Sequence, residues 1–374
     1  MKKIVLFSLF LISFIVQCGK EKHVDVIRSF CYWKTYSPYY EGKDTLMKQM
    51  KLTHLYVRFF DVGFNPYDKK AYPIASLNDI NFQENVSELT PSIFISNDVL
   101  LNATKSSLDT LSFQIKKRTT NLLSKFVKNE VERISNAQLA DTLNKKKSKI
   151  PNISLINQTI TNKFKTLLID CDWSEKSKEN YFYLLEKLKK EFSSFTLQAT
   201  IRLYQYKYYE KTGIPPVTNG LLMCYNITNP TKFDVKNSIA TVNDFKDYIT
   251  HNKYPLKLDI ALPLFSWNLV FRGSEFKGIL SEDIDFKTPS NRFKKVDETH
   301  YAITDDFLAG TTYLRNGDEI RIEKISNDDL IEMISVLKEN IKMSGQTKVT
   351  FFSFDEKYIT NYGTSKINTF YEKF

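Results

Sequence analysis

Residues 166–192 read TLLIDCDWSEKSKENYFYLLEKLKKEF: a short apolar run, a polar link and a longer amphipathic stretch. The run 166–169 is mostly apolar without alternation, which is typical of a parallel strand buried on both faces. In 178–192 the apolar residues recur at helical spacing, at Tyr181, Leu184, Leu185, Leu188 and Phe192. Ser174 and Ser177 precede this stretch as candidate helix caps. The segment therefore predicts one strand followed by one helix.

The same alternation extends along the chain. Two more stretches are helical in pattern, 328–341 and a long region at about 106–143. Short apolar runs rich in strand-forming residues occur at 29–33, 55–60, 92–95, 166–169, 196–201, 220–224, 256–262 and 349–354. Eight such strands alternating with helices predict an α/β fold, a (β/α)8 TIM barrel that forms a single domain over 26–374. The Gly-punctuated region from Thr288 to Glu323 predicts an elaborated loop between strands 7 and 8.

The amino terminus carries an export pattern. Lys2 and Lys3 precede an uncharged apolar stretch, residues 4–16, which is too short to span a bilayer and fits the apolar region of a signal peptide. Cys18 follows almost directly, so the segment resembles the lipobox of bacterial lipoproteins. Gln17 stands where that motif usually has a small residue, as in the relaxed lipoboxes of Bacteroidetes.

The lipobox resemblance implies removal of residues 1–17, lipidation of Cys18 with palmitate-type chains, and a short tether at 18–25. Acyl chains hold a protein to a membrane without a transmembrane helix. The expected location is the cell envelope, at the outer membrane of a Gram-negative bacterium, with the membrane contacted through the lipid on Cys18. An ordinary signal peptide with an incidental cysteine is the alternative.

Composition and spacing exclude several classes of function. The formal charge is +10, but the lysines are scattered among acidic residues and no nucleic-acid-binding module is recognisable, so no nucleic-acid partner is predicted. There is no GxGxxG and no P-loop, and no cofactor is expected. The four histidines lie apart from one another and from any cysteine pair, so no metal site is predicted. Cys31, Cys171 and Cys224 lie in or beside apolar runs and are expected to be buried free thiols.

In a TIM barrel the functional site lies where strands end, at the carboxyl-terminal face. All three tryptophans and several polar side chains fall there: Trp33, Arg58, Asp61, Asp170, Asp172, Trp173, Arg202, Gln205, Tyr225, Asn226 and Trp267, with Asp355 and Glu356 after the eighth run. Aromatic rings and hydrogen-bonding side chains are what a sugar requires, so the set predicts a glycan or cell-wall polysaccharide as ligand.

Each of these residues also has a structural interpretation. A tryptophan at a strand end can cover the core, and Arg58 or Arg202 can form buried ion pairs with Asp170 or Asp172. Asp259 lies in the middle of the seventh run, and we expect it to be hydrogen-bonded across strands. The tyrosine-rich run 204–209 can simply pack a loop. Both interpretations stay open at this point.

Three segments resemble family 18 glycoside hydrolases, the chitinases and their relatives. Residues 168–173, LIDCDW, look like the fourth-strand signature DxxDxDxE, and 223–226, MCYN, look like the sixth-strand pattern Met-x-Tyr-Asp. Residues 258–265, LDIALPLF, are similar to the seventh-strand segment. The chain also resembles glycosidase-like barrel lipoproteins of Bacteroidetes. The resemblance implies substrate-assisted hydrolysis, in which Asp170 and Asp172 match the last two aspartates and Tyr225 the tyrosine that holds the acetamide group.

The chain departs from that signature at important positions. Ser174 stands where the family has its acid glutamate, and a serine cannot serve as general acid. Leu167 replaces the first aspartate, and Asn226 replaces the aspartate after the tyrosine. Glu175 is one residue too late to substitute for the missing acid. Asp172, with its pKa raised by Asp170, is the first candidate for a surviving acid.

Three hypotheses follow. In the first, the chain is an envelope glycosidase-like enzyme with Asp170 and Asp172 as catalytic candidates, and Trp33, Arg58, Asp61, Trp173, Arg202, Gln205, Tyr225, Asn226 and Trp267 bind the substrate. In the second, the same groove binds a glycan without cleaving it. In the third, the barrel is only a scaffold. A second carboxylate across the groove from Asp172 would favour hydrolysis, and its absence would favour binding.

Overall fold

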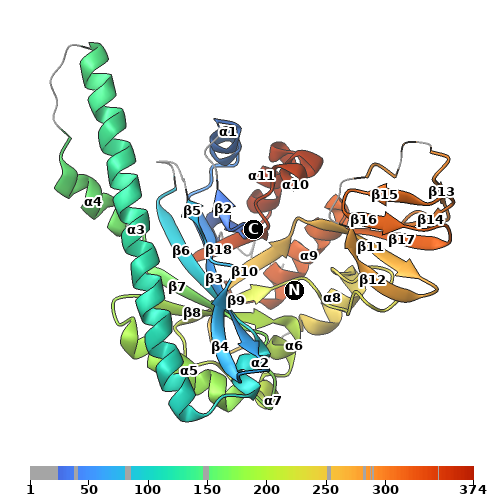
Figure 1. Cartoon of the computed structure of the whole chain (residues 1–374), viewed down its shortest axis with the longest axis horizontal. Helices are drawn as coiled ribbons and strands as arrows, with labels where there is room; N and C mark the ends of the chain where they lie inside the picture. The colour runs from blue at the N-terminus through green and yellow to red at the C-terminus, as the bar shows by residue number, and fades with distance from the viewer. Residues whose placement is uncertain are drawn as a thin grey trace, which may run out of the picture.

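Eight parallel strands close into a barrel in the computed structural model, which describes residues 24–37, 41–80, 86–145, 151–250, 254–280, 284–286, 288, 290–343 and 345–374 (Figure 1). Each strand pairs with two neighbours, and β1 pairs with both β18 and β3, which closes the ring. The barrel strands are β1 (Asp25–Tyr32), β3 (His54–Asn65), β6 (Glu88–Ile95), β7 (Thr166–Asp170), β8 (Thr196–Arg202), β9 (Asn219–Met223), β10 (Lys257–Pro263) and β18 (Gln346–Phe352). The predicted TIM barrel is confirmed.

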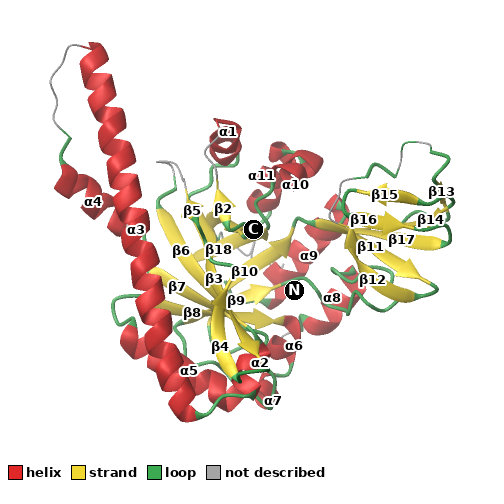
Figure 2. Cartoon of the chain, in the orientation of Figure 1, coloured by secondary structure: helices red, strands yellow, loops and turns green. Residues whose placement is uncertain are grey.

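Helices surround the barrel, as Figure 2 shows. They are α1 (Glu41–Gln49), α2 (Asn97–Leu101), α3 (Lys105–Lys145), α4 (Ile153–Thr161), α5 (Lys178–Glu191), α6 (Leu203–Lys207), α7 (Tyr209–Thr212), α8 (Val242–Tyr248), α9 (Asn327–Asn340), α10 (Glu356–Tyr362) and α11 (Thr364–Glu372). The stripe predicted for α5 is buried at Tyr181, Leu184, Leu185 and Leu188. Ser326 caps α9, because its hydroxyl accepts a hydrogen bond from the Asp329 amide at 3.0 Å. The long α3 projects well beyond the barrel (Figure 1).

Polar side chains inside the barrel link its strands. Asp259, in the middle of β10, accepts hydrogen bonds from the Gln198 amide at 2.8 Å, from Asn219 at 3.0 Å and from the Lys348 backbone amide at 2.8 Å. These partners belong to β8, β9 and β18, so one buried carboxylate joins four strands. The expectation that Asp259 is structural and bonded across strands is confirmed.

A second sheet is inserted between β10 and α9. Its strand order is β12-β11-β17-β14-β13, and it has an apolar cluster of its own that includes Val270, Tyr301 and Ile320. The strands are β11 (Ser266–Arg272), β12 (Glu275–Leu280), β13 (Phe293–Lys295), β14 (His300–Ile303) and β17 (Asp318–Lys324), with a hairpin of β15 (Phe307–Ala309) and β16 (Thr312–Leu314). The predicted elaboration between strands 7 and 8 is therefore present, but it starts at Ser266 and not at Thr288.

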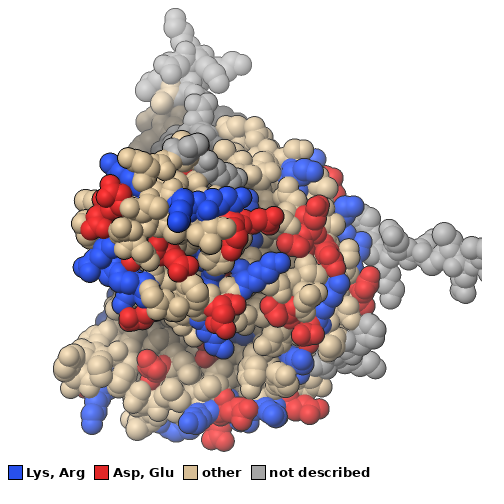
Figure 3. Space-filling model, turned by 90° about the vertical axis from the view of Figure 1, so that its right-hand side faces the viewer, with Lys and Arg blue, Asp and Glu red and all other residues tan. Residues whose placement is uncertain are grey.

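Smaller strands flank the barrel. β4 (Lys70–Ile74) pairs antiparallel with the end of β3, and β2 (Tyr36–Ser37) pairs with β5 (Asp79–Ile80). The three cysteines of the described part, Cys31, Cys171 and Cys224, are free and buried as predicted. No helix in the described ranges is long and apolar enough to cross a membrane. The face turned to the viewer in Figure 3 intersperses basic and acidic side chains.

Candidate functional site

An ion pair joins the ends of two neighbouring barrel strands. Asp172 follows β7 and Arg202 ends β8, and these strands run parallel with Ile169 opposite Ala199. The Arg202 guanidinium donates to both carboxylate oxygens of Asp172, from Nε to Oδ1 and from Nη2 to Oδ2, the latter at 2.5 Å. Such a bidentate contact fixes both groups in orientation.

Asp170 lies beside this pair and is 7% exposed. Its Oδ1 accepts a hydrogen bond from the Thr200 hydroxyl at 2.8 Å, and that hydroxyl also accepts one from the Cys171 amide at 3.1 Å. Burial, and then the nearby charge of Asp172, raise the pKa of Asp170 to about 6. Asp170 is therefore the carboxyl group here whose protonation changes near neutral pH.

Arg58 pairs with Asp61 and not with Asp170 or Asp172. A bulge in β3 shifts the pairing with β6 between Arg58 and Phe60, and the extra residue brings Arg58 and Asp61 to the same side of the strand. Arg58 Nε donates to Asp61 Oδ1 at 2.8 Å, and Nη2 donates to Oδ2. The guanidinium also lies over the ring of Trp33, 5.5 Å from its centre.

Trp173 and Gln205 hold the loops after β7 and β8. The Trp173 ring is 3% exposed, stacks on Tyr181 with centroids 5.0 Å apart, and donates from Nε1 to the Thr212 carbonyl at 3.0 Å. The buried Gln205 side chain donates to the Trp173 carbonyl at 2.9 Å and accepts from the Arg202 amide at 2.7 Å. Side chains this enclosed have little surface to offer a sugar, so they position Asp172 and Arg202.

Tyr225 and Asn226 follow β9. Tyr225 is buried, with its ring stacked on Phe352 at 5.3 Å and edge-on to Phe265 at 5.9 Å. Burial is the largest cause that raises the pKa of its hydroxyl well above the usual range, so the phenol stays protonated. Asn226 is exposed and has a positive φ of 55°, a left-handed conformation that asparagine tolerates better than most residues.

A pocket of about 260 Å3 opens at the ends of β7, β8 and β9. It brings together six of the predicted residues with parts of α6 and α8, and is lined by Asp172, Trp173, Arg202, Leu203, Tyr204, Gln205, Tyr225, Asn226, Ile227 and Tyr248. Tyr204 is 48% exposed, and its ring lies 4.9 Å from that of Tyr208. The sequence showed Tyr204 within a tyrosine-rich run, but nothing in the sequence indicated that Tyr248 of α8 reaches the same pocket.

The other predicted residues lie outside this pocket. Trp267 belongs to β11, where its Nε1 donates to Glu323 at 2.6 Å. Trp33 packs edge-on against Phe352 at 5.7 Å. Arg58, Asp61 and Asp170 are also absent from the pocket lining. Asp355 forms an ion pair with Lys34 at 2.8 Å and caps α10, at whose first turn Glu356 lies.

Ser174, at the position where the resemblance would place an acid, carries no carboxylate. The Ser174 amide donates to the Ser177 hydroxyl at 2.9 Å, which places Ser174 in the turn before α5. Glu175 is exposed. Asp172 is the one carboxylate among the described residues that line the pocket. In the same described part, no three His, Cys, Asp or Glu side chains gather closely enough to hold a metal ion.

Comparison with known proteins gives the fold. No family model matches the chain, and no curated protein matches it either. The structure is similar to the spore cortex-lytic enzyme SleL of Bacillus megaterium QM B1551, with a TM-score of 0.50 and 12% identity over 94% of this chain and 75% of that one. It also matches SleL of Bacillus cereus, with a TM-score of 0.45 and 12% identity over 94% of this chain and 75% of that one. A further match is chitinase ChiA74 of Bacillus thuringiensis, with a TM-score of 0.43 and 12% identity over 88% of this chain and 66% of that one. At this identity the likeness to the first enzyme establishes a shared barrel fold.

Proposed function

We propose that this barrel binds a glycan in the pocket at the ends of β7, β8 and β9, without hydrolysing it. The observation that carries the proposal is the state of Asp172. It is the one carboxylate lining the pocket among the described residues, and both its oxygens are bonded to Arg202. Glycoside hydrolysis requires a proton donor at the leaving oxygen, and Ser174 occupies the position that resembles that of the acid.

The remaining lining suits sugar recognition. Tyr204 and Tyr248 offer aromatic surface, and Arg202, Asp172 and Asn226 offer donors and acceptors for ring hydroxyls. The fold shared with an enzyme named for lysis of the spore cortex is consistent with a carbohydrate ligand. The raised pKa of Asp170 favours a second candidate, hydrolysis with Asp170 as acid, so turnover belongs in the same experiment.

Replacing Tyr204 with alanine is expected to weaken glycan binding about tenfold, because one sugar–aromatic stack is lost. The measurement is a glycan array with the full-length protein, followed by titration of the best ligand and by a hydrolysis assay. Tyr313→Ala is the matched control, since Tyr313 is 54% exposed but lies on β16, in the hairpin with β15 and away from the pocket lining. Turnover by the wild type that is lost in Asp170→Asn would establish the enzyme instead, and binding to no glycan would refute both candidates.

We also propose that Cys18 is lipidated and anchors the chain to the outer membrane of a Gram-negative cell. Cys18 and residues 1–17 lie outside the described residues, so the proposal rests on the sequence pattern. Cells fed a labelled palmitate analogue are expected to label the wild type but not Cys18→Ser. Fractionation should place the wild type in the outer membrane. Equal labelling of both chains, or labelling of neither, would contradict lipidation at Cys18.

A further inference from the structure

A second cavity, larger than the glycan pocket, lies between β4 and the first turns of α3. Its volume is about 840 Å3, and none of its lining residues belongs to the glycan pocket. Its floor is apolar: Phe64 of β3, Val99 of α2, and Leu108, Leu111 and Leu122 of α3. Val99, Leu108 and Leu111 are buried, so this floor continues the core of the barrel. A cavity of this size is in the range that holds a small organic molecule.

The charged residues that line this groove are all cations. They are Lys69, Lys70, Lys117, Arg118 and Lys125, and no carboxylate appears among the residues lining the groove in the described part of the chain. None of the five forms an ion pair with another described residue. Unpaired cations around a low-dielectric surface create a positive potential that attracts an anion.

Arg118 marks the position for that anion. Its guanidinium lies over the Phe60 ring, 5.3 Å from the centre, and its Nε is buried with no hydrogen-bond partner. A buried donor without an acceptor costs free energy, and arginine donates most strongly to an anionic oxygen. Lys117 precedes it on α3 and lines the same groove, so a second cation borders this groove.

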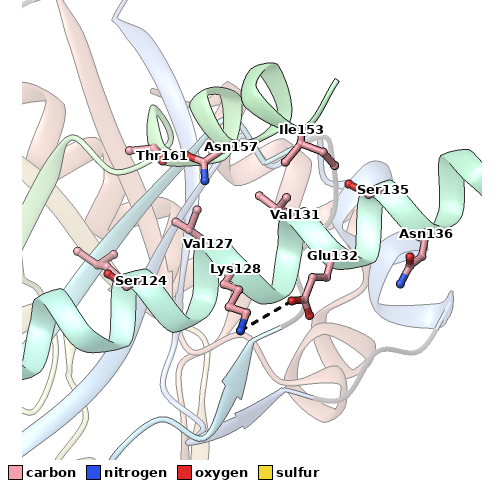
Figure 4. A pocket seen from close by; sticks show the side chains of 11 residues that line it. Ser124, Val127, Lys128, Val131, Glu132, Ser135, Asn136, Ile153, Asn157 and Thr161 are labelled. Carbon is pink, nitrogen blue, oxygen red and sulfur yellow. Dashed lines mark hydrogen bonds and ion pairs between the residues drawn. The ribbon is translucent and has the colours of Figure 1, made fainter. Parts of the chain in front are cut away.

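The neighbouring groove on α3 lacks this charge pattern. Figure 4 shows the cavity between α3 and α4, where Lys128 pairs with Glu132 at 4.0 Å across one helical turn. Its charged lining residues are this lysine and this glutamate, so cation and anion balance. The excess of cations is therefore specific to the groove beside β4 and is not a general property of α3.

We propose that the groove between β4 and α3 binds a single-chain anionic amphiphile of the fatty-acid class. The acyl chain lies along the apolar floor, where each buried methylene stabilises the complex by about 0.8 kcal/mol. The carboxylate is held by the guanidinium of Arg118, and Lys117 lines the same groove. This inference is independent of the glycan proposal, because the two cavities share no residue.

Fluorescence titration of the full-length protein with cis-parinaric acid tests the proposal. The wild type is expected to bind the probe saturably, and palmitate is expected to displace it. Hexadecanol, which has the chain without the charge, and inorganic phosphate, which has charge without the chain, should compete at least tenfold less well. Arg118→Gln and, separately, the exposed Lys117→Gln should each raise the Kd about tenfold, as expected for loss of a charge-assisted contact. Lys128→Gln, on the same helix but outside the groove, is the matched control and should bind like the wild type.

Three results would overturn the proposal. One is equal probe affinity in the wild type, Arg118→Gln and Lys117→Gln. Another is displacement by hexadecanol as effective as displacement by palmitate, because the cations would then have no part in binding. The third is an absence of probe binding while the protein sediments with phosphatidylglycerol vesicles in a manner that requires Arg118, because the groove would then be a membrane-docking surface and not a site for one lipid molecule.

Discussion

Replacing Glu323 with glutamine is expected to lower the free energy of unfolding by about 3 kcal/mol, because it leaves a buried arginine without its counter-charge. Arg321 and Glu323 are 0% and 1% exposed and lie on β17, two residues apart on the same face of the strand. Arg321 Nε donates to Glu323 Oε1 at 2.7 Å. The other carboxylate oxygen accepts hydrogen bonds from Ser238 and Trp267, so the charge is fully bonded.

The pair also connects the inserted sheet to the loop that follows the pocket. Arg321 donates to the carbonyls of Pro230, Lys232 and Phe233, all in the segment between β9 and α8. Denaturant unfolding measures the stability loss, and hydrogen exchange should show faster exchange in 226–241 in Glu323→Gln. Glu275→Gln is the control, because Glu275 pairs with Lys277 on the surface of the same sheet and such pairs contribute little. Equal losses of unfolding free energy in the two variants would show that the buried ion pair contributes no more to stability than the surface pair.

The barrel could be predicted from the sequence because its strands are buried on both faces. Runs such as 166–169 do not alternate between apolar and polar residues, so they differ clearly from strands with one face in solvent. The apolar residues of α5 recur at helical spacing. The start of the inserted sheet could not be predicted in the same way. The apolar run at 256–262 is followed closely by Phe265, and β11 is defined by its pairing with β17, whose first residue lies more than forty residues later. Such long-range pairing leaves no local signal.

The candidate site was predictable in its residue types, and the pairing of Arg202 with Asp172 was one that the sequence allowed, but the partner of Arg58 was not predicted. Asp172, Arg202, Tyr225 and Asn226 do meet around one pocket, because parallel strands bring their carboxyl ends to one face. Arg58 pairs with Asp61 because of a bulge in β3, and no residue pattern in the sequence predicts that bulge. Trp173 was a predicted substrate-binding residue, yet its ring stacks on Tyr181 inside the core. The sequence around Trp173 does not distinguish these two positions of the ring.

The charge of Asp170 is expected to make the protein less stable as the pH rises. Folding raises the pKa of this group from 3.8 to about 6, so the folded state binds its proton more tightly than the unfolded chain does. Below pH 3.8 both states hold the proton and the stabilising contribution is complete. As the pH rises through 6 the folded state must also lose it, and the contribution disappears. A difference of about two pKa units corresponds to about 3 kcal/mol between those limits.

Asp170→Asn removes this dependence because asparagine is neutral at every pH and its carbonyl can still accept from Thr200. The free energy of unfolding of the variant, relative to the wild type, is therefore expected to rise by about 2.4 kcal/mol between pH 4 and pH 8. Urea unfolding at several pH values measures it, with Asp25→Asn as the control, since Asp25 is exposed at the start of β1. If the free energy of unfolding of wild type and Asp170→Asn changed with pH in parallel, the pKa of Asp170 would be the same in the folded and unfolded states. Asp170 would then not be the group that holds a proton in the site.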